Sequence, residues 1–423
     1  MAVNARAGAV ALNLVTGNQT ITGLGFAPKL VLFQSTPDTS NIVTSIANAH
    51  YSYGAFDGVN QAVAMANERN GVATSDNQSR MDTGHVILVA DPAGTSTVDY
   101  SATGVSLNAD GFTINVDNAP PINYRMGYMA IGGSDIANVK VGSFLSNGGV
   151  GSLATTGIGF QPDVIIVFSS FVSGAMPISM GDAMMGFGFA NSALSVNQWA
   201  SGSWALDGTT GVLNASRSCG EGFVVWQPTT GSTVGLKASL LSFDPDGFTL
   251  NWTVHNTVVQ HNLFYIAIKG GAGFQSNVSS VILSATNGGS VSKTGLGFDP
   301  KVGIFAGSFL SVKNGVAAAG SGMSLGFVDD LKSHFMTANT GRFFAGVVGA
   351  WHSSHDARME RYIAYFNSSL LEDASLSSSN TGGFTLLSNK GTGSVGNYVG
   401  HLVMNATAPV PPVTGSEVFG YMV

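Results

Sequence analysis

Short apolar stretches alternate along the chain with turns rich in Gly, Asn and Ser, a pattern typical of antiparallel β-structure. In residues 109–116 and 245–252 an Asp-Gly turn precedes Phe and other apolar residues that alternate with Thr and Asn. This pattern predicts hairpin strands with one face exposed to solvent. Residues 29–36, 163–170 and 301–308 are short runs rich in Val, Ile and Phe that each follow a proline. Because proline cannot donate to a sheet, it marks the entry to a strand.

Two sequence markers occur three times in the same order. The first is T-G-[LI]-G-F-x-P-[KD] and the second is centred on Gly-Phe-Thr. Their phenylalanines are Phe26, Phe160 and Phe298 for the first marker and Phe112, Phe248 and Phe384 for the second. Segments 53–58, 185–192 and 324–330 also occupy comparable positions. Two markers repeated in register predict three homologous units.

We place these units at residues 1–137, 138–274 and 275–423, with residues 408–423 as a C-terminal extension. Each unit is predicted to be a jelly-roll-like antiparallel β-sandwich, so the fold class is all-β, with three tandem domains that can form a pseudo-threefold body. Helical periodicity is nearly absent, and its best candidate, residues 356–366, suits a strand equally well. We hypothesise that residues 414–423 add a strand to the first unit, which would close a ring, or to a neighbouring molecule.

Charged residues are scarce in this chain. Its 423 residues include 17 Lys or Arg and 24 Asp or Glu, with a net charge of −7. Nucleic-acid binding needs clustered basic residues, and a membrane span needs about 20 apolar residues in a row, so we predict neither partner. The single cysteine, Cys219, rules out a disulfide within the chain and is interpreted as a small buried apolar residue.

Candidate catalytic and metal-binding groups do not form a convincing set. The acidic pairs are Asp244 with Asp246, Asp329 with Asp330, and Glu372 with Asp373, and the first pair is explained by its turn. His352 and His355, with Asp356, lack a third metal ligand and are expected in a surface loop, as are His255 and His261. The sequence contains neither a G-x-S-x-G elbow nor a phosphate loop. We therefore assign no catalytic, cofactor-binding or metal-binding residue, expect no cofactor, and predict that the protein is not an enzyme.

Tryptophans and repeated arginines are the remaining candidates for contact with a partner. Trp226 and Trp252 lie in strand-like stretches and are expected in the core, whereas Trp199 and Trp204 lie in a loop-like stretch and are expected to be exposed, where they would stack on a sugar or contact a protein. One arginine recurs in each copy, namely Arg80, Arg217 and Arg358. Two interpretations remain open: a buried pair or threefold contact ring, and ordinary surface residues shared by ancestry.

The motifs TG[LI]GFxPxxVxF, [GS]-F-G-F-A, DGFT[IL]N and Y-x-A-I-x-G-G together resemble a family of tailed-bacteriophage virion proteins of poorly defined role. The resemblance covers all three copies and is strongest in the second. The third copy departs from it, since NTGGFTLLSN lacks the Asp-Gly turn and the Y-x-A-I-x-G-G ending is degraded. The resemblance implies a structural protein of the particle and transfers no catalytic residue.

This resemblance and the triplication predict a virion structural protein, namely a capsid decoration or cement protein that acts as a pseudo-trimer on the head surface. Its expected partners are the major capsid protein or other virion proteins, and its expected location is the virion, assembled in the host cytoplasm. The alternative is a tail or fibre component that binds host-surface glycans through loops such as residues 194–210. A glycan-active enzyme is disfavoured because no suitable pair of carboxylates is present.

Overall fold

The computed structural model describes residues 3–37, 39, 46–69, 76–90, 97–192, 197–208, 215–226, 234–256, 259–308, 310–317, 322–329, 334–344, 347–356, 363–366, 370–380, 382–391 and 396–406. Every helix or strand position assigned within these ranges belongs to a β-strand. The strands form six antiparallel sheets, which confirms the all-β prediction. No helix that would cross a membrane occurs in this part of the chain.

The six sheets form three pairs, each with a seven-stranded and a four-stranded sheet. The first pair consists of β1 (Asn4–Ala11), β11 (Arg125–Gly132), β3 (Pro28–Thr36), β5 (Ala49–Phe56), β6 (Gln61–Glu68), β7 (Asn77–Asp82) and β15 (Ile178–Met180), with β2 (Gly17–Thr22), β10 (Gly111–Asn118), β9 (Val98–Asn108) and β8 (Ile87–Ala90).

The second and third sheet pairs repeat this order. The second consists of β12 (Ile136–Leu145), β22 (Asn262–Gly270), β14 (Val164–Ser169), β16 (Ala183–Asn191), β17 (Asn197–Ala205), β18 (Ala215–Gly220) and β26 (Val316–Ala317), with β13 (Gly151–Thr156), β21 (Gly247–His255), β20 (Leu236–Asp244) and β19 (Val224–Trp226). The third consists of β23 (Phe274–Ile282), β33 (Tyr398–Ala406), β25 (Val302–Gly307), β27 (Gly322–Asp329), β28 (His334–Phe344), β29 (Val347–Asp356) and β4 (Ile46–Ala47), with β24 (Ser290–Lys293), β32 (Gly383–Gly391), β31 (Leu370–Asn380) and β30 (Ile363–Phe366).

The winding of each sheet pair differs in part from the predicted jelly roll. In the first pair, β1 pairs with β11 and β2 with β10, so the first and last strands cross between the two sheets. The strands between them form a meander within each sheet, β3-β5-β6-β7 and β8-β9-β10. In a jelly roll most successive strands change sheet. Only the outer strands therefore have jelly-roll winding.

The runs rich in Val, Ile and Phe form the strands β3, β14 and β25, whose two faces are both buried. In β3, Leu30 and Leu32 point into one apolar core, while Val31 and Phe33 point into another between the two sheets of the first pair. Successive side chains of a strand point to opposite faces, so a strand buried on both sides needs an unbroken apolar run. This explains why residues 29–36 do not alternate in polarity.

One apolar core is shared by all three seven-stranded sheets. Tyr53, Phe187 and Leu325 occupy equivalent positions in β5, β16 and β27 and all lie in this core, and the rings of Tyr53 and Phe187 meet edge to face at 5.3 Å. The buried hydroxyl of Tyr51 bonds to the Ser203 side chain and to the backbone of Met323. A single residue therefore joins the three sheet pairs, and each pair also has a core between its own two sheets.

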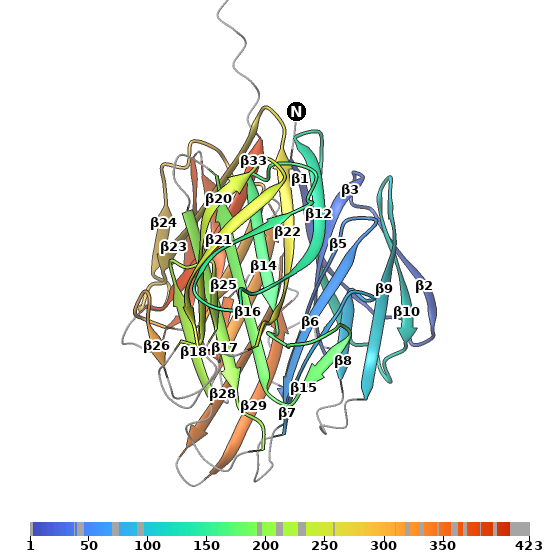
Figure 1. Ribbon diagram of the computed structural model, residues 1–423, viewed down its shortest axis with the longest axis vertical. Helices are drawn as coiled ribbons and strands as arrows, with labels where there is room; N and C mark the ends of the chain where they lie inside the picture. Colours follow the sequence, from blue (N-terminus) through green and yellow to red (C-terminus); the bar gives the residue numbers. More distant parts are fainter. Residues whose placement is uncertain are drawn as a thin grey trace, which may run out of the picture.

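Each seven-stranded sheet ends in a short strand that belongs, in sequence, to another sheet pair. The strand β15 of the second pair lies on β7 of the first, β26 of the third lies on β18 of the second, and β4 of the first lies on β29 of the third. These three exchanges form a closed cycle. Figure 1 shows one of these exchanges, with the green strand β15 of the second pair beside the blue strand β7 of the first.

The predicted unit boundaries fall near the first residues of β12 and β23. Residues 414–423, proposed to close a ring, lie outside the described residues, as does the rest of the extension at 408–423. In the part of the chain that is described, β4 closes the cycle between the first and third sheet pairs.

Candidate functional site at the interfaces between sheet pairs

The two repeated markers bind each other within a sheet pair. Gly23 and Gly25 of the first marker have φ values of +85° and +79°, a conformation that favours glycine. Their N–H groups both donate to the carboxylate of Asp110, which precedes the second marker, at 3.1 and 2.5 Å. The recurrence of both markers therefore has a structural explanation, because one forms a backbone cradle for the other.

The second sheet pair has the same clamp. The N–H groups of Gly157 and Gly159 donate to Asp246 at 3.0 and 2.5 Å, and these bonds lower the pKa of that exposed carboxyl group. Asp244 accepts bonds from the hydroxyls of Ser242 and Thr249. The turn role predicted for the Asp244–Asp246 pair therefore accounts for both carboxylates. In the third pair, Gly382 replaces the aspartate and donates instead to Asp299 at 2.7 Å.

A second set of equivalent residues joins neighbouring sheet pairs. Asp57, Asn191 and Asp329 each lie three positions after the glycine shared by β5, β16 and β27. Val141 N–H donates to Asp57 at 2.8 Å, the Asn191 amide donates to the Ser276 carbonyl at 2.9 Å, and Ala7 N–H donates to Asp329 at 3.1 Å. Each contact reaches the first strand of another pair. The contacts thus form a cycle: residues of the first, second and third pairs reach the second, third and first pairs, respectively. The exchanged strands form a cycle in the opposite sense, because strands of the second, third and first pairs lie on the first, second and third pairs.

Loss of the Asp329 carboxylate should destabilise the contact between the third and first sheet pairs. The carboxylate is buried, accepts from Ala7 N–H and lies 3.5 Å from the Arg6 guanidinium. Asp329→Ala should lower the free energy of unfolding by about 1–3 kcal/mol, because a buried donor loses its acceptor. Chemical denaturation measures this change. Asp329→Asn keeps an acceptor oxygen and should lose less, and equal losses in the two variants would contradict this role.

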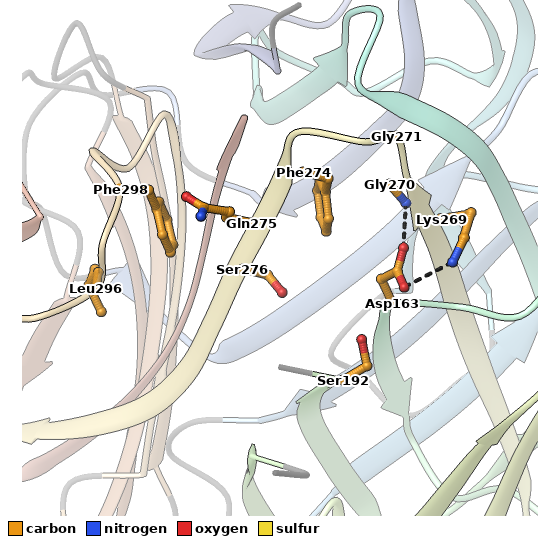
Figure 2. Close-up of a pocket in the computed structure, with 10 residues that line it drawn as sticks. All are labelled: Asp163, Ser192, Lys269, Gly270, Gly271, Phe274, Gln275, Ser276, Leu296 and Phe298. Carbon is orange, nitrogen blue, oxygen red and sulfur yellow. Dashed lines mark hydrogen bonds and ion pairs between the residues drawn. The ribbon is translucent and has the colours of Figure 1, made fainter. Parts of the chain in front are cut away.

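A groove of about 450 Å³ lies between the second and third sheet pairs (Figure 2). Asp163, at the entry to β14, accepts from Lys269 at 3.0 Å and from Gly270 N–H at 2.8 Å. The Phe274 ring lies against Gly270, where a Cβ would come within 2.1 Å of it. The groove is lined by Asp163, Ser192, Lys269, Gly270, Gly271, Phe274, Gln275, Ser276, Leu296 and Phe298.

The groove coincides with a departure from the threefold pattern. At the interface of the first and second pairs, Lys29 occupies the position equivalent to Asp163, and its ammonium donates across the interface to the Ile136 carbonyl at 2.5 Å. Asp163 instead turns to Lys269 and Gly270 of its own sheet (Figure 2). The paired charges, serine hydroxyls and phenylalanine rings offer a place for a small polar ligand. They do not form a nucleophile with an adjacent base.

An acid–base cluster lies on the first sheet pair. His85 Nδ1 is 3.0 Å from Asp82 Oδ2, and His85 Nε2 is 3.9 Å from Asp117 Oδ2. The hydrogen bond to Asp82 raises the pKa of His85 despite the opposing effect of partial burial. Burial also opposes ionisation of Asp82, but the bonds from His85 and Gly84 hold its pKa below the ordinary value. Among the described residues, no group of three or more His, Cys, Asp or Glu could hold a metal ion.

The His85–Asp82 bond should make stability depend on pH. Since folding raises the pKa of His85, the His85–Asp82 bond contributes its full stability at pH values below the unfolded-state pKa of about 6.5. This stability is lost as the pH rises through the folded-state pKa. His85→Gln should therefore lower the melting temperature more at pH 5.5 than at pH 8.5. Thermal melting of both proteins at the two pH values measures this difference, and an equal or larger loss at pH 8.5 would count against the assignment.

The prediction that Trp199 and Trp204 are exposed is wrong. Both lie in β17 and are 1% exposed. Trp199 stacks on Tyr398 of the third sheet pair at 6.3 Å. The small residues between the two tryptophans suggest a loop, but they belong to the strand β17. Trp252 is buried as predicted, and the side chain of Trp226 lies outside the described ones.

The histidines predicted in surface loops are placed differently. His261 is buried, its Nδ1 bonds to the Phe171 carbonyl, and burial lowers its pKa. His255 ends β21, with its Nε2 3.5 Å from the Ser146 hydroxyl. The pair His352 and His355 lies in β29, together with Asp356, so it belongs to a strand and not to a loop.

The other candidates are resolved in part. Arg80 is partly buried, with its guanidinium 3.8 Å from Asp82, and its carbonyl accepts from Ser170 of the second sheet pair. The side chain of Arg217 and all of Arg358 lie outside the described part, so the contact-ring interpretation stays a prediction. The side chains of Cys219, Trp351, Glu372 and Asp373 and the whole of residue 330 also lie outside the described part.

Two features escaped sequence reasoning. The exchanged strands β4, β15 and β26 have two, three and two residues, too short for any periodicity. The Asp57, Asn191 and Asp329 contacts did leave a signal, since these residues lie in the comparable segments 53–58, 185–192 and 324–330.

In comparisons with known proteins, the chain matches no family model and no curated protein. The resemblance to phage virion proteins therefore stays a prediction from the repeated motifs.

Proposed function

We propose that this protein is a non-enzymatic structural protein of a virus particle, a capsid decoration protein that docks on the shell as a pseudo-trimer. The observation that carries the proposal is the closed cycle of exchanged strands, which makes one chain resemble three interlocked subunits. In this proposal the three sheet pairs are homologous β-sandwiches of one ancestral kind, arranged about a pseudo-threefold axis.

The body is well suited to a purely structural role. Its three sheet pairs share an apolar core and are linked by hydrogen bonds at Asp57, Asn191 and Asp329, so they support each other without a metal or disulfide in the described residues. Viral shells contain many local threefold points, and a chain with threefold-like shape can occupy one as a single molecule. The partner in this proposal is the major capsid protein or another virion protein.

The alternative proposal is a tail or fibre component that binds host glycans. Trp199 and Trp204, for which sugar stacking and protein contact were both open, are buried and therefore do not support this alternative. The groove beside Phe274 and Asp163 takes their place, because an aromatic ring with nearby carboxylate and hydroxyl groups is a common way to hold a sugar (Figure 2).

Copy number separates the two proposals. Quantitative mass spectrometry of purified particles of the virus that encodes this chain should find tens to hundreds of copies per particle for a decoration protein. A handful of copies, together with glycan binding that is lost in Phe274→Ala, would favour the tail component. Absence of the chain from purified particles would overturn both proposals.

A further inference from the structure

Asparagine followed directly by glycine occurs four times in the sequence, at Asn70, Asn147, Asn287 and Asn314. In such a pair the backbone nitrogen of the glycine can attack the side-chain carbonyl carbon of the asparagine, because glycine has no Cβ and its backbone adopts many conformations. The last three pairs lie within the described structure, and Asn70 lies outside it. The surroundings of these three glycines decide which asparagine can react.

The pair Asn147-Gly148 has the reacting groups together and free of other contacts. It lies in the connection between β12 and β13, where the chain crosses from the seven-stranded to the four-stranded sheet of the second pair. Gly148 N–H donates to Asn147 Oδ1 at 2.9 Å, so the glycine nitrogen lies beside the carbonyl group that it would attack. Reaction needs such proximity, with the reacting atoms about 3–3.5 Å apart.

The backbone around this pair has room to move. Gly148 is exposed, and a Cβ placed on Gly148 or Gly149 would meet nothing within 4 Å. The hydrogen bond of the Gly148 nitrogen is made to the reacting side chain itself and not to another part of the chain. A small rotation therefore brings this nitrogen from the side-chain oxygen to the carbon next to it.

The glycine nitrogens of the other two described pairs are held by backbone carbonyl groups. Gly288 N–H donates to the Ser388 carbonyl of β32 at 2.8 Å, and Gly315 N–H donates to the Val312 carbonyl at 3.1 Å. Such a bond must break before the nitrogen can attack a side chain, and local opening of the structure costs free energy. Both pairs should therefore react more slowly than Asn147.

We propose that Asn147 is a site of spontaneous deamidation, with water as the co-reactant. The Gly148 nitrogen loses its proton to solvent and forms a bond to Asn147 Cγ. The bond between Cγ and Nδ2 breaks, so that ammonia leaves and a five-membered succinimide ring remains. Water then adds to one of the two ring carbonyl groups. Opening of the ring at Cγ gives aspartate, and opening at the backbone carbonyl gives isoaspartate, without any change of oxidation state.

The modification would change both the charge and the length of this connection. Either product adds a carboxylate, which is ionised near neutral pH. In isoaspartate the main chain runs through Cγ, so one more carbon separates β12 from β13. The neighbouring Ser146 is buried and donates its N–H to the His261 carbonyl at 2.8 Å, so the altered residue lies next to a bond that holds two connections together. This inference is independent of the proposed function.

Peptide mapping by mass spectrometry tests the proposal on the purified full-length protein. The protein is incubated under folding conditions, and the deamidated fractions at Asn147, Asn287 and Asn314 are followed with time. We expect Asn147 to react more than about tenfold faster than the other two, because their glycine nitrogens are held in backbone bonds. In concentrated urea these bonds are lost, and the three rates should become similar.

Gly148→Ala is the matched variant for this experiment. A Cβ at Gly148 meets no neighbour, and the φ of Gly148 lies outside the left-handed region, so the fold should be retained. The added Cβ restricts the backbone beside the attacking nitrogen, and deamidation of Asn147 should slow by more than about tenfold.

Three results would overturn the inference. The first is an equal rate at the three sites in the folded wild-type protein, and the second is deamidation of Asn147 only after unfolding. The third is an unchanged rate at Asn147 in folded Gly148→Ala. If this variant does not fold, the comparison of the three sites in wild-type protein decides alone.

Discussion

Replacement of Gly247 by alanine should cost about 3 kcal/mol of the free energy of unfolding. A Cβ at this position would lie 1.9 Å from the carbonyl oxygen of Thr155 in the paired strand β13, and backbone on both sides leaves no side chain that can move aside. Gly111 and Gly383 occupy the same position in the other sheet pairs, with clashes of 1.9 and 2.1 Å against Ile21 and Lys293. Close approach therefore explains why this glycine recurs three times.

Urea denaturation of Gly247→Ala and wild type measures the loss. Gly149→Ala is the matched control, because a Cβ at Gly149 meets nothing within 4 Å and its φ is not positive. We expect the control to change stability by no more than about 1 kcal/mol, in the stabilising direction. A similar stability for both variants would mean that β13 does not pass so close to Gly247.

Truncation of Phe187 should have a comparable effect on the whole body. This residue is buried in the shared core, where its ring contacts those of Tyr53 and Phe168. Phe187→Ala should lower the free energy of unfolding by about 3–5 kcal/mol, through lost burial and the cavity left behind. Thermal denaturation measures it, with Leu241→Ala, at a residue that is 54% exposed, as the control.

The shared core also determines where the effect of Phe187→Ala is felt. Native-state hydrogen exchange should become faster in β3 of the first sheet pair and β25 of the third, as well as in β14 beside it, because all three strands contribute to one core. Faster exchange confined to β14 and β16 would show that the second sheet pair is stable by itself, and would contradict a shared core.

The sequence predicted the fold class because the evidence for it is local and repeated. Residues 112–116 alternate in polarity and lie in β10, and the run at residues 29–36 lies in β3. The markers around Phe26 and Phe112 were recognised as repeats, and the structure adds their physical reason, namely the bonds from Gly23 and Gly25 to Asp110. Local pattern was sufficient where neighbouring residues decide the conformation.

Features that depend on distant strands were beyond local pattern. Trp199 and Trp204 resemble loop residues because Ala, Ser and Gly surround them, and only the packing of β17 between other strands buries them. The two residues of β4 pair with a strand about 300 positions away, which no periodicity can indicate. The groove beside Asp163 lies between two sheet pairs, so it depends on residues such as Lys269 and Phe274 that are more than 100 positions away from Asp163 in the sequence.

A cysteine crosslink between β4 and β29 tests the closed cycle most directly. Ile46 is the register partner of Ser353, so Ile46→Cys and Ser353→Cys, with Cys219→Ser to remove the native thiol, place two thiols on adjacent strands. Adjacent strands bring paired Cα atoms to about 5 Å, within reach of a disulfide. The closed cycle predicts an oxidised protein with the mass of a monomer and no free thiol. Two free thiols, or disulfide-linked dimers alone, would show that the first and third sheet pairs do not meet there.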